Sequence, residues 1–562
     1  MREPITGGEA ILSALIDKGV NTTFGIPGIQ TYPFFDAIAK HSEHIRHYTP
    51  RHEQSAAYMA TGYAKSTGKP GVYSVVPGPG ILNAGAAIST AKATNTPTLL
   101  VTGQVPSSYL GVGRGHLHEL DDQLATLKGI TKWSGRIDDA ASAAPKVNEA
   151  YAHMTTGRQG PVALEMCWDA MMTANRVDLT PSPTPHTILE KQPPLNLDAV
   201  KEAAALLSTA SNPMIMVGGG AQHAHESVLE LATLLDAPVT AFRSGRGIVS
   251  EDHPLGVSSA AAYELWPETD VLIGIGSRLE LQYMRWTGMG AYQSQAEAPP
   301  HLIRIDIDPS EIDRLEPHVG IVADSQEATN ALLEALIQRG FQSKGHQERI
   351  TNAKAKVQKQ IEKIQPQMAY LKVIREVLPR DGFFIKDLCQ IGYTSYFGFP
   401  VYEPLTYITS GYQGTLGFAF PTALGVKAGN PSRAVVAVVG DGGFMFGIQE
   451  LATAAQENIA LVTLVFNNGG YGNIRRDQQR LFENRVVGAD LTAPDFVMLA
   501  ESFGVRAHRV STPDALKPVL SSAIDSQLPA VIEIQVRKGE EISPWEFIVR
   551  NPAAASDGLK IV

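Results

Sequence analysis

Two short polar clusters near the C-terminal end of the chain carry the residue types of a cation site. The first, Gly-Asp-Gly with Asp441 at its centre, follows the apolar run AVVAVV, and the second, Asn467-Asn468, follows the next apolar run, ALVTLVF. Because neighbouring parallel strands end at the same edge of a sheet, we expect the two clusters to meet. Asp441 offers a carboxylate oxygen and Asn468 an amide oxygen, which suit a divalent cation such as Mg²⁺. A diphosphate could complete the coordination, held by the N-terminus of a helix expected to begin near Phe446.

Seven apolar runs that end at Gly, Asn or Asp alternate with helical patterns along the chain and predict the strands. They are VYSVV, TLLVTG, PMIMVGGG, VLIGIG, LIRIDID, AVVAVVGDG and ALVTLVFNN. Such runs are typical of parallel sheets buried between helices. The sequence therefore predicts an α/β fold of three doubly wound parallel-sheet domains.

Two stretches interrupt this alternation and mark the expected linkers. One is the Pro- and Thr-rich segment Leu179 to Pro194, and the other is the charged segment Gln347 to Gln367, which we expect to be helical. The predicted domains are residues 1–180, 190–345 and 368–550. A chain of 562 residues is also long enough for about three hydrophobic cores.

The composition excludes several classes of partner. The formal net charge is −10 and no Lys/Arg-rich run occurs, so neither a nucleic acid nor an anionic membrane surface is expected as a partner. The two cysteines, Cys167 and Cys389, are far apart and indicate no disulfide framework, which fits a reducing cytoplasm. The N-terminal segment is typical of an amphipathic helix and lacks the apolar core of a signal peptide. We therefore expect a cytoplasmic protein.

The G-D-G triplet with N-N after the next strand resembles the fingerprint of thiamine-diphosphate-dependent enzymes, and the resemblance extends across nearly the entire chain. A lone G-D-G is usually only a turn; the second strand with Asn-Asn-Gly-Gly is what favours the functional interpretation. The resemblance implies that Mg²⁺ is bound by Asp441, by the side chain of Asn468 and by the main-chain carbonyl of Gly470.

Other segments resemble the parts of this family that bind thiamine diphosphate. In GYQGTLGFAFPTALG the resemblance implies that Leu416 wedges the cofactor into a bent shape and that the carbonyl of Gly414 accepts from its pyrimidine amine. Gln390 matches a position near the diphosphate, although Ile391 replaces the histidine often found next. The remaining implied cofactor-binding residues are Gly440, Gly442, Gly443 and Tyr471.

Glu53 stands in RHEQSAAYMATGYA, a segment that resembles the family's R-H-E motif almost residue for residue. Taken alone, a glutamate in the first turn of a helix only stabilises the helix dipole. The resemblance makes it the catalytic glutamate, bonded to pyrimidine N1′, so that the cofactor can lose the thiazolium C2 proton and act as a nucleophile. The family places the cofactor between the Glu53 domain of one chain and the Asp441 domain of another, which implies a homodimer or homotetramer.

Two further loops supply candidates for proton transfer. His116 and His118, with Glu119 beside them, follow TGQVP, which resembles the acetolactate synthase group. Counting from TGQVP places His116 at the family's catalytic glutamine, whereas counting back from ITKW places Glu119 there, and both alignments stay open. Gln30, in GIPGIQTYP, stands where the similar loops of benzoylformate decarboxylase and benzaldehyde lyase carry a catalytic residue; it can hydrogen-bond a substrate but cannot titrate near neutral pH.

The middle region resembles the domain that holds FAD in acetolactate synthase. The matching segments are MVGGG (216–220), GSRLELQ (276–282) and IRIDIDPSEI (303–312). The second arginine of the synthase segment is Gln282 here, and the segment after the metal loop is closer to benzoylformate decarboxylase. FAD binding and a scaffold without flavin both stay open, and the departures favour the second.

The predicted function is that of a 2-oxo-acid decarboxylase or carboligase, in which the cofactor ylid adds to the acid and an enamine forms as CO₂ leaves. A 2-hydroxy-ketone or acyl-CoA lyase with the same cofactor is the nearest alternative. A non-catalytic cofactor-binding protein is the alternative from another class, and the presence of Glu53, Asp441 and Asn468 together argues against it.

Overall fold

The computed structural model describes residues 4–177, 194–280, 282–287 and 296–549. Most of the expected linker between Leu179 and Pro194 lies outside these ranges. The second expected linker is helical, as predicted, because α14 runs from Gln347 to Ile361. The predicted N-terminal helix is present as α1, Gly7–Asp17, whose first turn is capped by Thr6.

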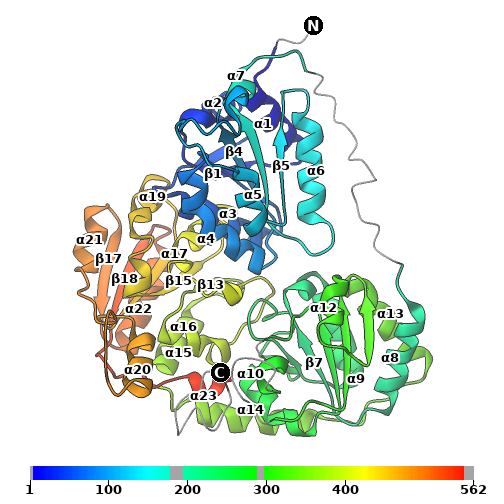
Figure 1. Cartoon of the computed structure of the whole chain (residues 1–562). Helices are drawn as coiled ribbons and strands as arrows, with labels where there is room; N and C mark the ends of the chain where they lie inside the picture. The colour runs from blue at the N-terminus through cyan, green and yellow to red at the C-terminus, as the bar shows by residue number, and fades with distance from the viewer. Residues whose placement is uncertain (1–3, 178–193, 281, 288–295, 550–562) are drawn as a thin grey trace.

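Within the described residues, eighteen strands form three six-stranded sheets, and every strand pair in them is parallel (Figure 1). This confirms the predicted α/β class with three parallel sheets. All seven predicted strands are present, as β3, β4, β7, β10, β11, β15 and β16. The exact domain boundaries stay a prediction.

The N-terminal sheet has the order β2-β1-β3-β4-β6-β5. Its strands are β1 (Thr22–Gly25), β2 (Arg46–Tyr48), β3 (Gly71–Val75), β4 (Thr98–Gln104), β5 (Trp133–Ile137) and β6 (Val162–Cys167). The helices of this region after α1 are η1 (Ile29–Thr31), α2 (Tyr32–Lys40), α3 (Glu53–Thr67), α4 (Pro79–Ala93), η2 (Ser107–Tyr109), α5 (Gln123–Ile130), α6 (Ala143–Thr155) and α7 (Trp168–Met172).

The middle sheet has the order β12-β11-β10-β7-β8-β9. Its strands are β7 (Pro213–Val217), β8 (Val239–Thr240), β9 (Gly256–Val257), β10 (Val271–Ile275), β11 (His301–Asp306) and β12 (Val319–Val322). Its helices are α8 (Leu197–Thr209), η3 (Gly219–Ala224), α9 (His225–Leu235), α10 (Ser259–Leu265), η4 (Trp266–Glu268), α11 (Tyr283–Trp286), α12 (Pro309–Asp313) and α13 (Ser325–Gln338). Counted from its own first strand the order is 3-2-1-4-5-6 in reverse, the arrangement of dinucleotide-binding folds.

The C-terminal sheet has the order β14-β13-β15-β16-β18-β17. Its strands are β13 (Phe383–Lys386), β14 (Tyr407–Ile408), β15 (Val435–Gly440), β16 (Val462–Asn467), β17 (Arg506–Val510) and β18 (Ala530–Gln535). Besides α14, its helices are α15 (Gln367–Val377), α16 (Gln390–Gly398), η5 (Gly411–Gln413), α17 (Ala419–Gly429), α18 (Asp441–Phe444), η6 (Ile448–Glu450), α19 (Leu451–Gln456), α20 (Gly472–Leu481), α21 (Phe496–Ser502), α22 (Pro513–Asp525) and α23 (Trp545–Val549). Counted from its first strand, this sheet has the same strand order as the N-terminal sheet.

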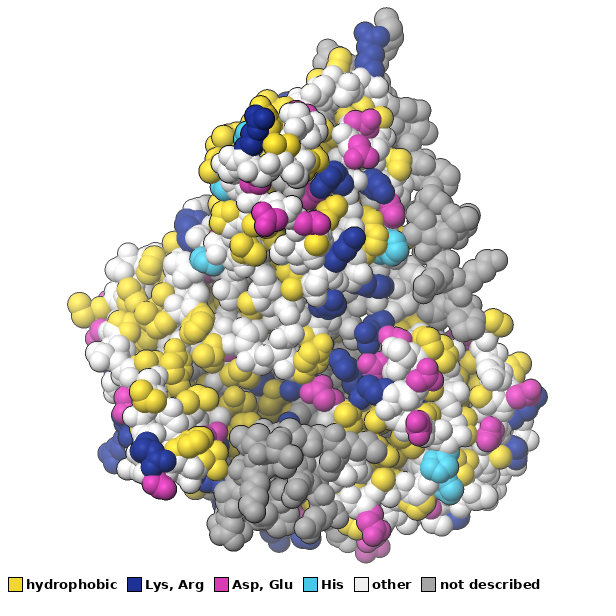
Figure 2. Space-filling view, in the orientation of Figure 1, with side chains coloured by type: hydrophobic (Ala, Val, Ile, Leu, Met, Phe, Trp, Pro, Cys, Tyr) yellow, Lys and Arg dark blue, Asp and Glu magenta, His cyan; other side chains and the backbone are white. Residues whose placement is uncertain are grey.

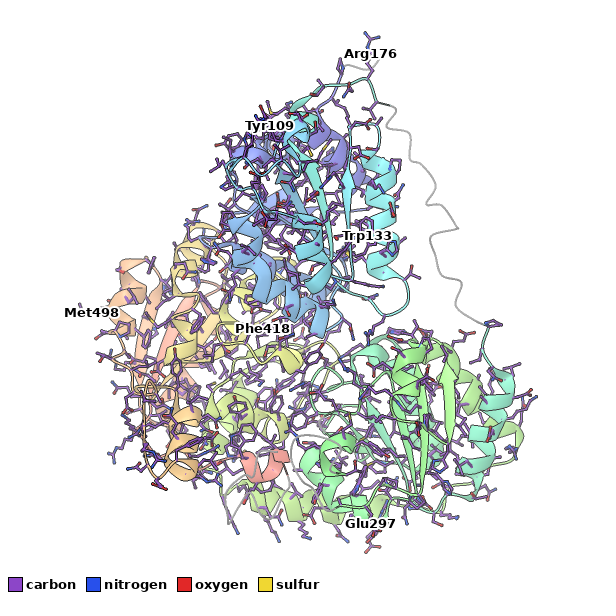
Figure 3. The ribbon with its side chains drawn as sticks, in the orientation of Figure 1. Tyr109, Trp133, Arg176, Glu297, Phe418 and Met498 are labelled. Atoms are coloured by element: carbon purple, nitrogen blue, oxygen red, sulfur yellow. The ribbon has the colours of Figure 1, made fainter. Side chains whose placement is uncertain are left out.

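The N-terminal and C-terminal domains of the chain are joined by α3 and α17, which cross closely (Figure 1). Two glycines allow this approach, because an added Cβ at Gly62 would overlap the carbonyl oxygen of Thr422, and one at Gly425 would overlap that of Met59. Phe418, labelled between the two domains in Figure 3, packs edge-to-face on Tyr58 at 5.5 Å. The helix that begins at Glu53 is therefore fixed to the C-terminal domain of its own chain.

A helical segment begins close to the expected Phe446, since η6 starts at Ile448 and continues directly into α19. A shorter helix, α18, was not predicted; it begins at Asp441 and ends at Phe444. Phe446 lies in the turn between α18 and η6, and an added Cβ at Gly417 would overlap the Cβ of Phe446. The turn after α18 therefore packs on the 411–417 segment.

Among the described helices, none combines the length and the apolar character needed to cross a bilayer. Basic and acidic side chains gather where the N-terminal and middle domains meet, as Figure 2 shows. These two domains therefore meet through charged groups.

Candidate cofactor site

Asp441 is the centre of the candidate cation site. Strands β15 and β16 are neighbours, with Gly440 paired to Phe466, so Asp441 and Asn468 follow adjacent strand ends as predicted. Asp441 is only 3% exposed, and its Oδ2 atom has no hydrogen-bond partner. Burial raises its pKa, although the backbone N–H groups of Gly442, Gly470 and Asn468 lower it. A buried carboxylate oxygen without a partner fits a divalent cation, whose charge would offset the cost of burial.

The Asn468 side chain has only its oxygen end left for a cation. Its Nδ2 donates a hydrogen bond to Oε2 of Glu541 at 2.7 Å. The backbone around Gly470 is also fixed, because Gly470 forms an antiparallel bridge with Asp490 and the N–H of Tyr471 donates to Ala489. In the part of the chain that the structure describes, no three His, Cys, Asp or Glu side chains form a metal cluster. The candidate site therefore consists of one carboxylate and neutral oxygens.

Glycines around Asp441 keep the backbone close to its neighbours. An added Cβ at Gly442 would lie 2.5 Å from the ring of Tyr471, and one at Gly443 would lie 3.2 Å from Oδ2 of Asp387. A Cβ at Gly440 would lie 3.2 Å from Cys389. These contacts explain why larger residues are absent from the loop.

Gln390 begins α16 near this loop, as its predicted role near a diphosphate requires. It is 6% exposed, and its Oε1 has no hydrogen-bond partner. A buried amide oxygen without a partner is a second group that fits a bound polar ligand.

The segment from Gly414 to Gly417 is held by a carboxylate that the sequence analysis missed. Asp387 accepts from the N–H of Gly417 at 3.0 Å and from that of Leu388 at 2.7 Å. Burial raises the pKa of Asp387 to about 6. Gly414 has φ +59°, and Leu416 is half-buried. Asp387 directly follows β13, and a carboxylate after a buried strand is the signal that could have identified it.

Glu541 is the other carboxylate that the sequence did not indicate. Burial is the largest cause that raises its pKa, to about 7; the hydrogen bond from Asn468 lowers it and the charge of Asp441 raises it. It comes from the segment after β18, far along the chain from both clusters, so no local motif points to it.

Glu53 is the first residue of α3, in a helix capped by His52. Its side chain is half-buried, and its Oε2 accepts from Nδ2 of Asn83 at 3.0 Å. Among the described residues, no hydrogen bond or ion pair joins it to Asp441 or Asn468. A single chain therefore does not bring the two halves of the predicted site into contact.

Gln30 and His118 form a pair between two loops of the N-terminal domain. Gln30 is 6% exposed; its Nε2 donates to the carbonyl of Leu117 at 2.8 Å, and its Oε1 lies 2.7 Å from Nδ1 of His118. An amide oxygen can only accept, so this contact places the proton of a neutral imidazole on Nδ1 and leaves Nε2 as the acceptor. Burial also lowers the pKa of His118.

His116 and Glu119 have a different environment. The His116 ring packs against Tyr109 with centroids 4.1 Å apart, and its backbone N–H donates to Oε2 of Glu119 at 2.8 Å. Hydrogen bonds from backbone N–H groups, that of His116 first, lower the pKa of Glu119. Glu119 thus closes its own loop, and of the three residues only His118 is held by Gln30.

The two sets of candidate residues lie at opposite parts of the chain. Figure 3 places Tyr109, the neighbour of His116, near the upper end of the N-terminal domain, whereas Figure 1 shows α20, which follows Asn468, at the lower edge of the C-terminal domain. This separation agrees with the missing contact between Glu53 and Asp441.

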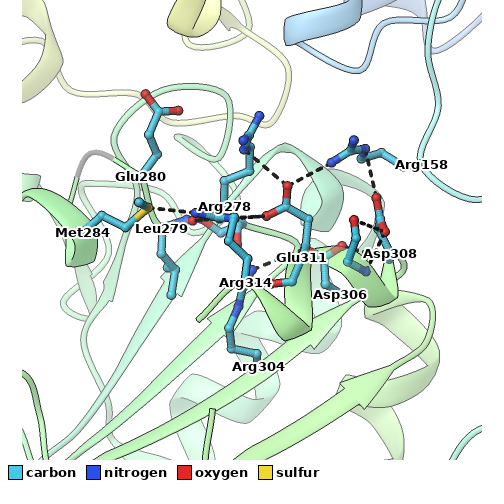
Figure 4. A network of polar contacts seen from close by, with 12 residues as sticks. Arg158, Arg278, Leu279, Glu280, Met284, Arg304, Asp306, Asp308, Glu311 and Arg314 are labelled. Carbon is cyan, nitrogen blue, oxygen red and sulfur yellow. Dashed lines mark hydrogen bonds and ion pairs between the residues drawn. The ribbon is translucent and has the colours of Figure 1, made fainter. Parts of the chain in front are cut away.

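In the middle domain, the buried carboxylate of Glu311 contacts three arginines, and one of them, Arg278, belongs to a segment that resembles a flavin site (Figure 4). Glu311 contacts Arg314 at 2.7 Å, Arg158 at 2.9 Å and Arg278 at 3.4 Å. Arg304 is fully buried and donates to the carbonyl of Ser277 at 2.6 Å. Asp308 contacts Arg158 and Asp306 contacts Arg304, so these arginines already have partners within the protein.

The glycine loops of this domain pack on each other. The N–H of Gly220 donates to the carbonyl of Gly276 at 3.0 Å, and an added Cβ at Gly276 would lie 2.6 Å from the carbonyl carbon of Gly220. Gly218 is equally close to Ser277. Close packing explains these glycines.

Three family models match the chain in succession. They are the thiamine pyrophosphate enzyme N-terminal TPP binding domain at residues 5–126, the central domain at 200–332 and the C-terminal TPP binding domain at 389–534. Each match overlaps one of the three parallel sheets.

Several characterised or annotated proteins are similar over nearly their full length. The chain is 34% identical to a probable acetolactate synthase large subunit of Methanocaldococcus jannaschii, covering 95% of this chain and 93% of that protein. It is 31% identical to a probable 2-ketoarginine decarboxylase of Pseudomonas aeruginosa, covering 95% and 94%. It is 27% identical to the acetolactate synthase isozyme 1 large subunit of Escherichia coli, covering 97% and 96%.

Proposed function

Because the chain belongs to the thiamine pyrophosphate enzymes, we propose that it is a 2-oxo-acid decarboxylase or carboligase that binds thiamine diphosphate and Mg²⁺. The observation that carries this proposal is the buried, unpartnered Oδ2 of Asp441 beside Asn468. The names of the relatives, acetolactate synthase and 2-ketoarginine decarboxylase, support a 2-oxo acid as the substrate class.

Each candidate side chain has a separate task. Asp441, the amide oxygen of Asn468 and the carbonyl of Gly470 would hold the cation, whose charge would offset that of the diphosphate. Thiamine diphosphate supplies the carbon nucleophile and the electron sink for cleavage beside a carbonyl. Glu53 binds the protonated form of pyrimidine N1′, and His118, held by Gln30, moves a proton at its Nε2 atom to or from the substrate.

We assign Glu53 to the cofactor site of a second copy of the chain. The observation that supports a homodimer, and a homotetramer built from it, is that one chain leaves Glu53 without contact to Asp441 or Asn468. Apolar side chains are exposed near both half-sites, as expected of surfaces that a second copy covers. They include Ile29 at 41%, Leu82 at 56% and Leu117 at 58% in the N-terminal domain, and Tyr412 at 44%, Phe446 at 49% and Ile474 at 52% in the C-terminal domain.

We propose that the middle domain is a scaffold without FAD. Glu311 contacts Arg158, Arg278 and Arg314, and the glycine loops pack on each other. The purified protein should then show no flavin absorbance, and one flavin per chain would refute this assignment. The cytoplasmic location and the absence of a nucleic-acid partner stay predictions from composition.

The function is tested by supplying thiamine diphosphate, Mg²⁺ and a panel of 2-oxo acids and measuring both CO₂ release and acid consumption. Simple decarboxylation releases one CO₂ for each acid consumed, whereas ligation of two acid molecules releases one CO₂ for every two. Cleavage of a 2-hydroxy ketone without CO₂ release would establish the lyase alternative instead. Cofactor binding with no turnover of any substrate class would indicate a non-catalytic binder.

A further inference from the structure

Glu541 is a carboxyl group that the proposed mechanism does not use, although it lies at the candidate cation site. It is half-buried, and its contact is with Nδ2 of Asn468 rather than with a basic side chain. The charge of Asp441 acts on it directly. Here a carboxyl group lies beside another acidic side chain, and among the described residues no basic side chain bonds to it. Its presence at this place requires an explanation.

The hydrogen bond to Asn468 decides which end of that amide stays free for a ligand. An asparagine side chain can turn by half a rotation and exchange its oxygen for its NH₂ group, and only the oxygen can bind a cation. Glu541 Oε2 accepts from Nδ2 at 2.7 Å, so turning the amide would place two acceptor oxygens against each other. The contact therefore selects the orientation that a cation requires.

The backbone that follows Glu541 is anchored by hydrogen bonds, which limits where its carboxyl group can lie. Next to it, the N–H of Ile542 donates to Gln365, and Gln367 Nε2 donates to the carbonyl of Ile542 at 2.6 Å. Trp545 Nε1 donates to Oδ1 of Asn473 at 2.6 Å. Figure 1 shows the consequence, with α23 lying beside α20, the helix that follows the cation loop.

We propose that Glu541 is a positioning residue of the cation site, which holds the amide of Asn468 with its oxygen toward Asp441. This inference rests on the proposed function, because it takes Asp441 and Asn468 as the cation ligands. The segment after β18 lies outside the cation-site motif, and the proposal gives it a role in cation affinity. Residues that orient metal ligands in this way are typically worth about 10- to 100-fold in metal affinity.

The test measures Mg²⁺-dependent binding of thiamine diphosphate to the full chain by titration calorimetry, without any turnover. Glu541→Leu should weaken Mg²⁺ binding by about 10- to 100-fold. Glu541→Gln keeps an acceptor oxygen for Nδ2 and should remain within a few-fold of the wild type. If Glu541→Gln loses as much affinity as Glu541→Leu, the charge acts directly on the cation and the positioning role is refuted.

A charge exchange provides a second test that does not depend on the leucine variant folding. Asn468→Asp places a carboxylate against Glu541 and should weaken Mg²⁺ binding, whereas the double variant Asn468→Asp with Glu541→Gln restores a donor and acceptor pair and should bind more tightly than the single variant. Equal affinities of Asn468→Asp in both backgrounds would overturn the proposal.

Two controls separate this inference from the proposed function. Glu540→Leu changes an exposed carboxyl one residue away and should leave Mg²⁺ binding unchanged. Asp441→Ala should abolish Mg²⁺-dependent cofactor binding. If Asp441→Ala binds normally, the cation site itself is wrong; if Asp441→Ala loses binding while Glu541→Leu does not, only the role of Glu541 is wrong.

Discussion

The N-terminal and C-terminal sheets have the same strand order but carry different kinds of polar residue at their strand ends. In the C-terminal domain, Asp441 and Gln390 are buried and each keeps an oxygen without a partner. In the N-terminal domain, Glu53 is half-buried and bonded to Asn83, and the buried Gln30 is satisfied by Leu117 and His118. One sheet therefore leaves oxygens open to a charged ligand, whereas the candidate groups of the other already bond within the chain.

This difference shows that topology alone does not determine the chemistry of a strand end. Unpaired buried oxygens are costly, and their retention on the C-terminal sheet indicates a ligand that compensates for them. The N-terminal sheet has no such cost, since its candidate groups already have protein partners. Variants on the two sheets should accordingly fail in different measurements.

The largest effect is expected from Asp441→Ala, which removes the one carboxylate among the proposed cation ligands. Mg²⁺-dependent binding of thiamine diphosphate should fall by more than the ~100-fold that loss of a ligand-orienting residue can cause. Calorimetry measures this directly. Asp525→Ala, which removes an exposed carboxylate from α22 of the same domain, is the matched control and should bind normally.

Glu53→Gln should give the opposite pattern on the other sheet. Cofactor affinity should stay close to that of the wild type, while exchange of the C2 proton of bound cofactor and turnover fall by about 10²- to 10⁴-fold, because an amide cannot hold the N1′ proton as a carboxylate does. NMR follows the exchange. An exchange rate equal to that of the wild type would remove Glu53 from the mechanism.

Mixing these two variants tests whether the sheets of different chains cooperate. A heterodimer of Glu53→Gln and Asp441→Ala subunits contains one site with both native residues only if each site is formed between two chains. Co-expression should therefore restore turnover that neither variant has alone. Continued inactivity of an isolated heterodimer would show that the site lies within one chain.

A smaller effect is expected within the N-terminal domain. His118→Ala should lower turnover by about 10²-fold or more and remove one limb of the pH profile, with cofactor affinity and C2 exchange unchanged. His116→Ala is the matched control from the same loop, because His116 packs on Tyr109 and is not held by Gln30. Turnover lost in His116→Ala but not in His118→Ala would reverse the assignment.

The smallest effect concerns stability. Burial lowers the pKa of His47 from 6.5 to about 4, so the unfolded chain gains a proton at a higher pH than the folded chain. The contribution of His47 to the free energy of unfolding is fully present above pH 6.5. It is lost as the pH falls toward 4, and the loss is at most about 3 kcal/mol. The unfolding temperature of His47→Gln should depend less on pH in this range than that of the wild type, with His44→Gln as an exposed control. Parallel curves for all three proteins would contradict the prediction.

The features that could be predicted from the sequence are those that follow from a local pattern of residues. The alternation of apolar runs predicted the three parallel sheets, and the pairing of β15 with β16 follows from two strands in succession. The turn that separates α18 from η6 was not predicted; there Phe446 packs against Gly417, a contact between segments distant in sequence. Glu541 was missed for the same reason.

The choice between His116 and His118 likewise required coordinates. Both histidines stand in one loop with the same local composition, and the two alignments, offset by three residues, placed either His116 or Glu119 at the family's glutamine. The distinguishing contact is with Gln30, 88 residues away from His118 in the sequence. Contacts of this kind are set by tertiary packing, which no motif encodes.

The crossing of α3 and α17 ties the half-site that carries Glu53 to the domain that carries Asp441 in the same chain. Gly62 and Gly425 bring the two backbones into direct contact at this crossing, which leaves little room for one domain to shift against the other. In the proposed dimer each crossing would link two active centres, so we expect a bulky residue at Gly62 to disturb both centres without touching either.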